Sequence, residues 1–210
     1  MGTEWDKRYG QDDYLFGTEP NVFLTSQSFR LERGMRALAV ADGEGRNGVW
    51  LAEQGIDVVA VDASFVGLEK SCALAARRGV KLTTVQADFA EWKWETGQYD
   101  AVIAIFIQFA EPALRERMFE GFYTTLKPGG SLIMQGYRVE KLRYGTGGPP
   151  DAERLYTREL LLHSFASWEV LRLHEHDEAI EEGIGHSGTS ALIDLVARKP
   201  ADIICSPTAS

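Results

Sequence analysis

The chain has 210 residues, a net charge of −9 and 44% hydrophobic residues, which favours one globular domain with a sizeable core. An acidic chain repels phosphate backbones, and its basic stretches (77–81 and 30–36) are short, so we expect a small-molecule partner and no nucleic acid. The chain has only two cysteines, so we expect no disulfide framework. Its first residues are polar, which is unlike a signal peptide, and its longest apolar run, 101–109, is too short to span a membrane. We therefore expect a cytoplasmic protein.

Short β-rich runs alternate with helix-length amphipathic segments from residue 34 onward. We expect strands at 35–40, 58–61, 82–85, 101–106 and 131–137, and helices around 49–54, 65–78 and 112–126. The run 101–106 is apolar throughout, as in a central parallel strand buried on both faces. Residues 127–130, Lys-Pro-Gly-Gly, indicate a turn. The alternation predicts an α/β, Rossmann-like, doubly wound and mostly parallel seven-stranded sheet.

The two ends of the chain differ from this middle region. Residues 1–33 are aromatic and polar and predict an N-terminal helical lid, 34–199 form the main domain, and 200–210 a disordered tail. A loop is expected at 144–150 and a helix at 156–165. Residues 168–174 and 191–196 then predict a C-terminal antiparallel hairpin.

The strongest chemical signal is the segment 41–48, Ala-Asp-Gly-Glu-Gly-Arg-Asn-Gly, between the first strand and the first helix of the alternating region. Its glycines allow a ligand to approach the backbone closely, and the helix N-terminus behind them favours negative charge. The same G-x-G-x-x-G spacing fits a dinucleotide fingerprint, so the loop alone does not identify the ligand.

Asp62 ends the second expected strand. A carboxylate at this position accepts hydrogen bonds from both hydroxyls of an adenosine ribose. The alternative role is the N-cap of the helix that begins near Phe65. The glycine loop and Asp62 together favour an adenosine-containing cofactor without saying which one.

Three further features follow in order: 85–89, Val-Gln-Ala-Asp-Phe; Tyr99-Asp100; and 126–130, Leu-Lys-Pro-Gly-Gly. With the glycine loop and Asp62, they resemble the ordered motifs of class I S-adenosylmethionine (SAM)-dependent methyltransferases. Segments 5–9 and 14–21, the loop 144–149 and His186 look like small bacterial methyltransferases of the tellurite-resistance and thiopurine type. Two positions depart from the class: Ala39 replaces a common acidic residue, and Ala41 replaces a common glycine and narrows the freedom of the loop.

The resemblance implies a site for SAM and its product S-adenosylhomocysteine (SAH). Gly43 and Gly45 would contact the methionine part, whose ammonium would meet Asp42 and whose carboxylate would meet Arg46. The remaining implied cofactor residues are Trp5, Tyr9 and Phe16 over the adenosine or sulfonium, Asn47 in the loop, and Ala63, Asp88, Phe89 and Ile105, of which Asp88 would accept from the adenine amino group. The structural alternatives are a salt bridge for Arg46, a loop-stabilising contact for Asn47, a helix cap for Asp88, core packing for Ile105 and Phe106, and a plain hydrophobic lid for the three aromatic residues.

The acceptor would approach near Gln108, Tyr137 and Tyr144, past the ends of the fourth and fifth strands. A thiolate or metalloid oxyanion needs no general base, whereas a hydroxyl or amine does, with Tyr144 or His186 as candidates. The four histidines lack compact ligand spacing, so no metal is expected. The expected function is SAM-dependent methyl transfer by direct displacement to a small-molecule acceptor, such as a thiol or a metalloid oxyanion. We expect a monomer or homodimer. The alternative functions are a non-catalytic SAM sensor and an NAD-dependent oxidoreductase.

Overall fold

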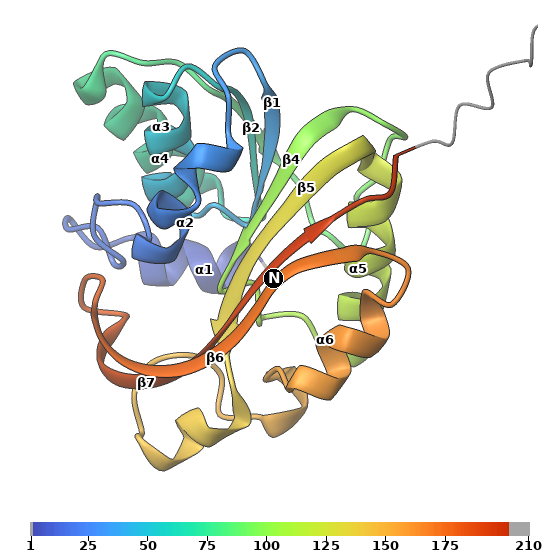
Figure 1. The fold of residues 1–210 in the computed structure, drawn as a ribbon. Helices are drawn as coiled ribbons and strands as arrows, with labels where there is room; N and C mark the ends of the chain where they lie inside the picture. The colour runs from blue at the N-terminus through green and yellow to red at the C-terminus, as the bar shows by residue number, and fades with distance from the viewer. Residues whose placement is uncertain (1, 202–210) are drawn as a thin grey trace, which may run out of the picture.

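The computed structural model describes residues 2–201, which form a seven-stranded sheet covered by helices on both faces (Figure 1). The strands are β1 (Arg36–Val40), β2 (Asp57–Asp62), β3 (Thr83–Gln86), β4 (Tyr99–Ile105), β5 (Leu126–Tyr137), β6 (Glu169–Glu181) and β7 (Ser187–Arg198). Their order is β3-β2-β1-β4-β5-β7-β6. The first five strands are parallel, and β7 is antiparallel to both β5 and β6. The predicted Rossmann-like sheet and C-terminal hairpin are confirmed.

The helices divide into two groups around the sheet. They are α1 (Gly2–Tyr9), α2 (Val22–Ser26), α3 (Arg46–Glu53), α4 (Phe65–Arg78), α5 (Pro112–Thr125) and α6 (Arg158–Ser164), with short 3₁₀ turns η1 (Ser28–Arg30), η2 (Val139–Arg143) and η3 (Ala152–Arg154). Figure 1 shows α1 to α4 on one side of the sheet and α5 and α6 on the other. None of the helices among residues 2–201 combines the length and apolar character that a membrane crossing needs.

The core follows from the apolar strands that the sequence indicates. Every residue of β4 except Asp100 is buried, since helices cover both faces of this central strand. One core cluster contains Leu38, Val102 and Phe122 and fills the α5 side, and the other contains Leu24, Ile103 and Ile133 and fills the α2 side. Alternate residues of the same strands thus contribute to opposite faces.

The predicted turn at 127–130 is wrong in its extent, because these residues belong to β5. The pairing of β5 with β4 is irregular between Tyr99 and Ala101. In this part of β5, Gly129 and Gly130 form backbone hydrogen bonds with Lys199, which follows β7. The Gly129 nitrogen donates to the Lys199 carbonyl at 3.0 Å, and the Lys199 nitrogen donates to the Gly130 carbonyl at 2.9 Å. Backbone pairing therefore continues the strand through the Pro-Gly-Gly segment.

The hairpin strands are longer than predicted, and the sixth helix is shorter. β6 and β7 pair continuously from Glu169–Arg198 to Glu181–Ser187, with one irregularity between Val170 and Arg172. β6 forms an edge of the sheet. α6 begins after Thr157, whose side chain accepts from the Leu160 nitrogen as an N-cap. The predicted tail at 200–210 lies outside the described residues from 202 onward.

Candidate functional site

The candidate site lies where β1, β2, β4 and β5 end at one edge of the sheet. Two non-glycine residues there have left-handed backbone conformations: Ala41 (φ 50°), just after β1, and Phe106 (φ 56°), just after β4. Non-glycine residues rarely adopt this conformation, and they concentrate at functional sites. Ala41 thus has the backbone angles that suit glycine, although the sequence carries alanine there. Both residues turn the chain sharply toward a common cavity.

The two loop glycines have different structural roles. A Cβ atom on Gly43 would lie 2.6 Å from the Tyr9 hydroxyl oxygen, so Gly43 allows α1 to pack on the loop. A Cβ atom on Gly45 would lie 2.2 Å from Ser71 Oγ, so Gly45 allows α3 to pack against α4. Gly45, at φ 90°, caps α3 and does not line the cavity. Gly45 thus allows helix packing, and its expected contact with the cofactor stays a prediction.

Asp62 is buried and held by backbone amides on both carboxylate oxygens. Oδ2 accepts from the Gly43 nitrogen and Oδ1 from the Ser64 nitrogen, each at 2.8 Å. The cap of α4 is Ser64, whose Oγ accepts from the Gly67 nitrogen at 3.0 Å, so the N-cap interpretation of Asp62 is wrong. Burial raises the pKa of Asp62, against the opposing effect of its backbone hydrogen bonds. The carboxylate thus faces the cavity in a fixed orientation.

A cavity of about 720 Å³ opens at this edge. It is lined by fourteen of the residues that the sequence singles out: Trp5, Tyr9, Phe16, Asp42, Gly43, Arg46, Asn47, Asp62, Ala63, Phe89, Ile105, Gln108, Tyr137 and His186. Gly45, Asp88 and Tyr144 do not line it. Asp88 caps its own turn by accepting from the Ala90 nitrogen at 2.9 Å and borders a second cavity of about 900 Å³. Tyr144 is 41% exposed and donates to Asp177 at 2.6 Å.

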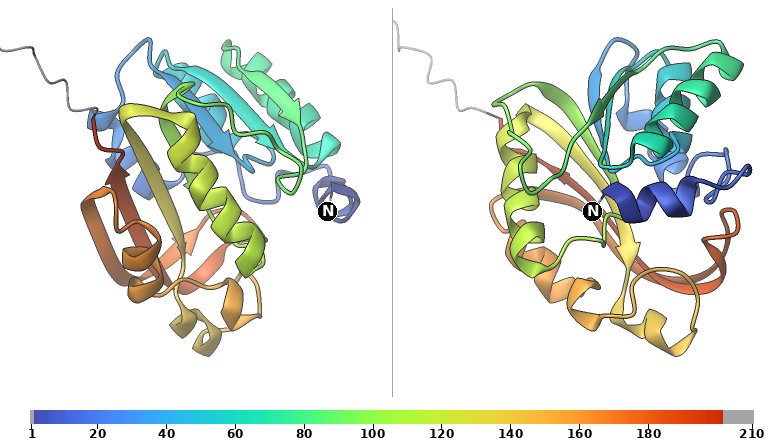
Figure 2. Two further views of the ribbon diagram at one scale, coloured as in Figure 1. Left: turned by 90° about the vertical axis from the view of Figure 1, so that its right-hand side faces the viewer. Right: turned by 180° about the vertical axis from the view of Figure 1, so that it is seen from behind.

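The N-terminal segment closes one side of the cavity. Trp5 stacks on Tyr9 with ring centroids 5.3 Å apart, and Phe16 lies 6.3 Å from Tyr9. Asp6 anchors α1 by accepting from the Ser64 hydroxyl at 2.6 Å. Figure 2 shows this segment beside the tip of the β6–β7 hairpin, where the Gly185 nitrogen donates to the Leu15 carbonyl at 2.9 Å. Whether residues 1–33 act as a lid stays a prediction.

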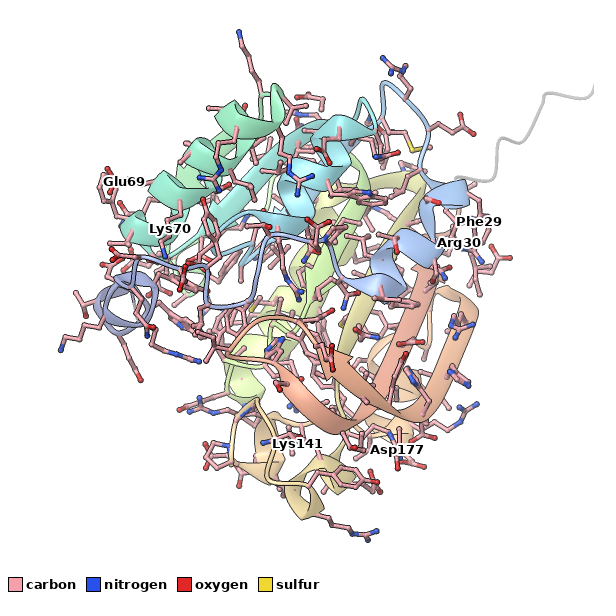
Figure 3. The ribbon with its side chains drawn as sticks, turned by 90° about the vertical axis from the view of Figure 1, so that its left-hand side faces the viewer. Phe29, Arg30, Glu69, Lys70, Lys141 and Asp177 are labelled. Atoms are coloured by element: carbon pink, nitrogen blue, oxygen red, sulfur yellow. The ribbon has the colours of Figure 1, made fainter. Side chains whose placement is uncertain are left out.

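Glu44, which the sequence analysis did not assign, fixes the same segment to the glycine loop. Its buried carboxylate accepts from the Leu15 nitrogen at 2.8 Å and pairs with Lys70 at 2.7 Å. Figure 3 shows Lys70 on α4, facing the N-terminal segment. Asn47 acts similarly, because its Oδ1 accepts from the Asn21 nitrogen at 2.9 Å. Both side chains line the cavity and also hold its loops together.

The other side of the cavity contains a buried ion pair. Arg46 Nη2 lies 2.7 Å from Glu182 Oε2, and His186 Nδ1 lies 3.4 Å from the same oxygen. Glu182 and His186 sit in the turn between β6 and β7. The His186 ring packs against Phe106, with centroids 4.5 Å apart, and against Tyr137 at 5.8 Å. Arg46 is therefore in a buried ion pair and not in the surface salt bridge weighed as its alternative.

Burial and neighbouring charges shift several ionisations here. Burial raises the pKa of Asp42 to about 7, and its hydrogen bond from Gly48 opposes the rise. Burial alone would raise the pKa of Glu182. The hydrogen bond with His186 and the nearby Arg46 charge lower it by more, so that the pKa is about 2. Burial lowers the pKa of His186. At neutral pH the ion pair is charged and the imidazole is neutral.

Gln108 serves as a structural clamp at the end of β5. Its Nε2 donates to the Tyr137 carbonyl at 2.8 Å, and its Oε1 accepts from the Tyr137 nitrogen at 2.6 Å. Nε2 also donates to the Arg154 carbonyl at 3.2 Å, so both amide hydrogens are used within the protein, and the expected contact of Gln108 with a substrate stays a prediction. Tyr137 differs, since its hydroxyl is buried without a hydrogen-bond partner among residues 2–201.

A separate polar cluster occupies the α2-side face of β6 and β7. His174, His176 and Asp194 place one ligand atom each within 4.8 Å of one another, a set able to hold a metal ion. Arg172 already contacts the buried Asp194 carboxylate at 3.1 Å, and Gln135 donates to it at 2.7 Å. Protein groups therefore satisfy Asp194 without an ion.

The sheet order and the cavity at its carboxyl edge define the class I methyltransferase type of Rossmann-like fold. A protein from echinomycin biosynthesis, solved in connection with the conversion of a disulfide bond into a thioacetal group, has the same fold with a TM-score of 0.79 and 15% identity, over 97% of this chain and 93% of that one. TehB from Haemophilus influenzae matches with a TM-score of 0.68 and 15% identity, over 94% of this chain and 66% of its own.

The sequence comparisons agree with the fold. Residues 37–130 match the family model described as a methyltransferase domain. The glycine/sarcosine N-methyltransferase of Halorhodospira halochloris is 33% identical over 138 residues, which are 62% of this chain and 47% of that protein. The chain spans about half the length of the curated relatives it matches. The match of residues 37–130 to a methyltransferase domain, together with these similar proteins, confirms the resemblance and the cofactor class predicted from the motifs.

Proposed function

We propose that the protein transfers the methyl group of SAM to a small-molecule acceptor by direct displacement. The observation that carries the proposal is the convergence of Asp62, the Gly43 turn and the aromatic lid residues on one cavity at the carboxyl edge of the sheet. The cavity volume of about 720 Å³ lies in the range of small-molecule sites. The name of the Halorhodospira relative adds amines to the thiols and metalloid oxyanions as acceptor candidates.

The residues around the cavity fit both polar ends of SAM. Each Asp62 oxygen has one backbone partner and retains acceptor capacity, which suits two ribose hydroxyls. Arg46 Nη1 is buried and has no hydrogen-bond partner among the described residues, which suits the carboxylate of the methionine part. Asp42, beside it in the cavity wall, suits the ammonium. The adenine would lie near Ala63, Phe89 and Ile105, all of which line the cavity.

The chain's own contribution to the reaction is binding, orientation and exclusion of water. SAM, when bound, supplies both the electrophilic methyl group and the leaving group. Trp5, Tyr9 and Phe16 line the cavity, and aromatic rings attract a sulfonium as they attract other cations, such as the Arg8 guanidinium 4.2 Å from the Trp5 ring centre. The contacts of Asp6 and Glu44 hold these rings over the site, so that donor and acceptor meet in a water-poor space.

Binding measurements with three adenosine-containing ligands test the proposal. SAM and SAH should raise the Tm of the full chain and quench its tryptophan fluorescence, because both occupy the cavity beside Trp5, whereas NAD should do neither. Transfer of labelled methyl from SAM to small acceptors should follow. Stabilisation by NAD alone would overturn the proposal in favour of an oxidoreductase. Tight binding of SAH, with no acceptor methylated, would favour the sensor.

A further inference from the structure

His186 projects from the β6–β7 turn into the cavity, on the side away from Asp62 and Phe89. His186 is 6% exposed, and its ring is surrounded by Phe16, Phe106 and Tyr137, with centroids 4.4, 4.5 and 5.8 Å away. In the sheet, Asp62 ends β2 and Tyr137 ends β5, with β1 and β4 between them. A nucleoside on Asp62 therefore leaves the Tyr137 and His186 end for the methyl acceptor.

Glu182 fixes the orientation of this imidazole. His186 Nδ1 lies 3.4 Å from Glu182 Oε2, and the carboxylate is itself held by Arg46 at 2.7 Å and by Asn21 Nδ2 at 2.9 Å. A neutral imidazole that donates from Nδ1 carries its lone pair on Nε2. Nε2 has no hydrogen-bond partner in the part of the chain that the structure describes. The arrangement orients a base in the same way that a buried carboxylate orients histidine in hydrolytic triads.

We propose that His186, positioned by Glu182, is the general base for the methyl acceptor, and that this acceptor is an amine or hydroxyl compound whose nucleophile carries a proton when it enters the site. The proposal rests on the proposed methyltransferase function and specifies its acceptor class. His186 is then a catalytic residue, and Glu182 is a positioning residue. Tyr144, the other candidate base in the sequence, lies outside the cavity and hydrogen-bonds to Asp177.

The charges around His186 suit this role. Burial lowers the pKa of His186, the Arg46 and Arg8 charges lower it further, and the Glu182 hydrogen bond and charge oppose them. Tyr137, the remaining titratable group against the ring, has its pKa raised by burial and stays neutral. The imidazole is thus free to accept a proton at neutral pH. Once protonated, it faces the Glu182 carboxylate, which stabilises the new positive charge.

The step is balanced by the groups present. The lone pair on the acceptor nitrogen or oxygen forms the bond to the methyl carbon, and the electron pair of the carbon–sulfur bond stays on sulfur, which leaves neutral SAH. The acceptor proton moves to His186 Nε2. A thiol acceptor differs, since a substantial fraction already exists as thiolate near pH 8.5 and needs no base.

A paired-acceptor experiment on the full chain tests the assignment. Wild type and His186→Gln are assayed with labelled SAM and three probes: sarcosine, catechol and thiophenol, an aromatic thiol that is largely ionised at neutral pH. The substitution should lower kcat by roughly 100-fold or more for the accepted amine or hydroxyl probe, as expected for loss of a general base. Methylation of the thiol, if it occurs, should change by less than about threefold, because the thiolate needs no base. The matched control is His163→Gln, an exposed histidine of α6.

Glu182→Gln provides a readout that a purely structural role would not give. Without the carboxylate, the pKa of His186 should fall, so the acid limb of the kcat/KM profile should move to lower pH while the plateau rate drops. SAH affinity and Tm, measured on each variant, separate this effect from misfolding. Methylation of the thiol alone, or full activity of folded His186→Gln with an amine or hydroxyl, would overturn the inference and leave the methyltransferase intact. Failure of wild type to bind SAH would instead overturn the proposed function.

Discussion

The two halves of the cavity are built in different ways. The Asp62 half is set by backbone turns directly after strands: Asp62 binds amides 19 and 2 residues away in the chain. The His186 half is set by side chains that meet from distant segments, as in the hydrogen bond from Asn21 to Glu182, which lie 161 residues apart. A half made of backbone turns holds a constant ligand, and a half made of side chains can be altered by single substitutions. The contrast fits a fixed cofactor and a variable acceptor.

The largest effect should come from removing the Asp62 carboxylate. Asp62→Ala deletes the partner of the Gly43 and Ser64 amides and the proposed ribose contact, so the Kd for SAH should rise by about 100-fold or more. Isothermal titration calorimetry measures this change. Asp57→Ala, at the exposed start of the same strand, is the control and should leave Kd unaltered. An unchanged Kd in Asp62→Ala would mean that the two halves are misassigned.

A smaller effect should follow from the ionisation of Asp42. Its pKa is raised to about 7 by burial, so the carboxylate gains its charge between about pH 6 and 8. Cationic SAM should therefore bind more tightly as pH rises across this window, by roughly tenfold, and SAH, which lacks the sulfonium charge, by less. Asp42→Asn should flatten the pH dependence of the SAM Kd. Equal pH profiles for SAM and SAH would show that Asp42 does not sense the sulfonium.

The smallest effect concerns the backbone of the glycine loop. Ala41→Gly relieves a left-handed conformation at φ 50° and should raise the free energy of unfolding by about 1 kcal/mol, measured by urea denaturation. Ala37→Gly, in the interior of β1, is the opposite control and should lower it by about 1 kcal/mol. Destabilisation by both substitutions would indicate that Ala41 packs in a way that outweighs its backbone strain.

The contrast between the halves also explains what the sequence could predict. The alternation of strands and helices, the glycine loop and Asp62 follow from local periodicity and from residues placed at strand ends, so they were predictable. The role of Glu182 could not be predicted, because its partner Arg46 lies on another element and no short motif contains both residues. Glu44 stands inside the glycine loop, yet its contact with Leu15 depends on how the N-terminal segment folds back.

Three residues that the motifs indicated do not line the main cavity. Gly45 belongs to the pattern of the loop, but the neighbouring helix uses the space that its missing side chain leaves. Asp88 lies beside Phe89, yet only Phe89 lines the main cavity, since consecutive residues point in different directions. Tyr144 follows the fifth strand by several residues, and the η2 turn carries it toward Asp177. In each case the motif gave a position along the chain, and the direction of the side chain depends on tertiary packing that the sequence does not show.

The outer strand of the sheet has a consequence for how copies of the protein meet. β6 is thirteen residues long and ends the sheet, a geometry that invites another strand to add on. Its sequence, Glu-Val-Leu-Arg-Leu-His-Glu-His-Asp-Glu-Ala-Ile-Glu, is rich in acidic residues, and its pairing is irregular near Val170. Two such edges would bring carboxylates together along their length, so the strand resists edge-to-edge aggregation through its own charge.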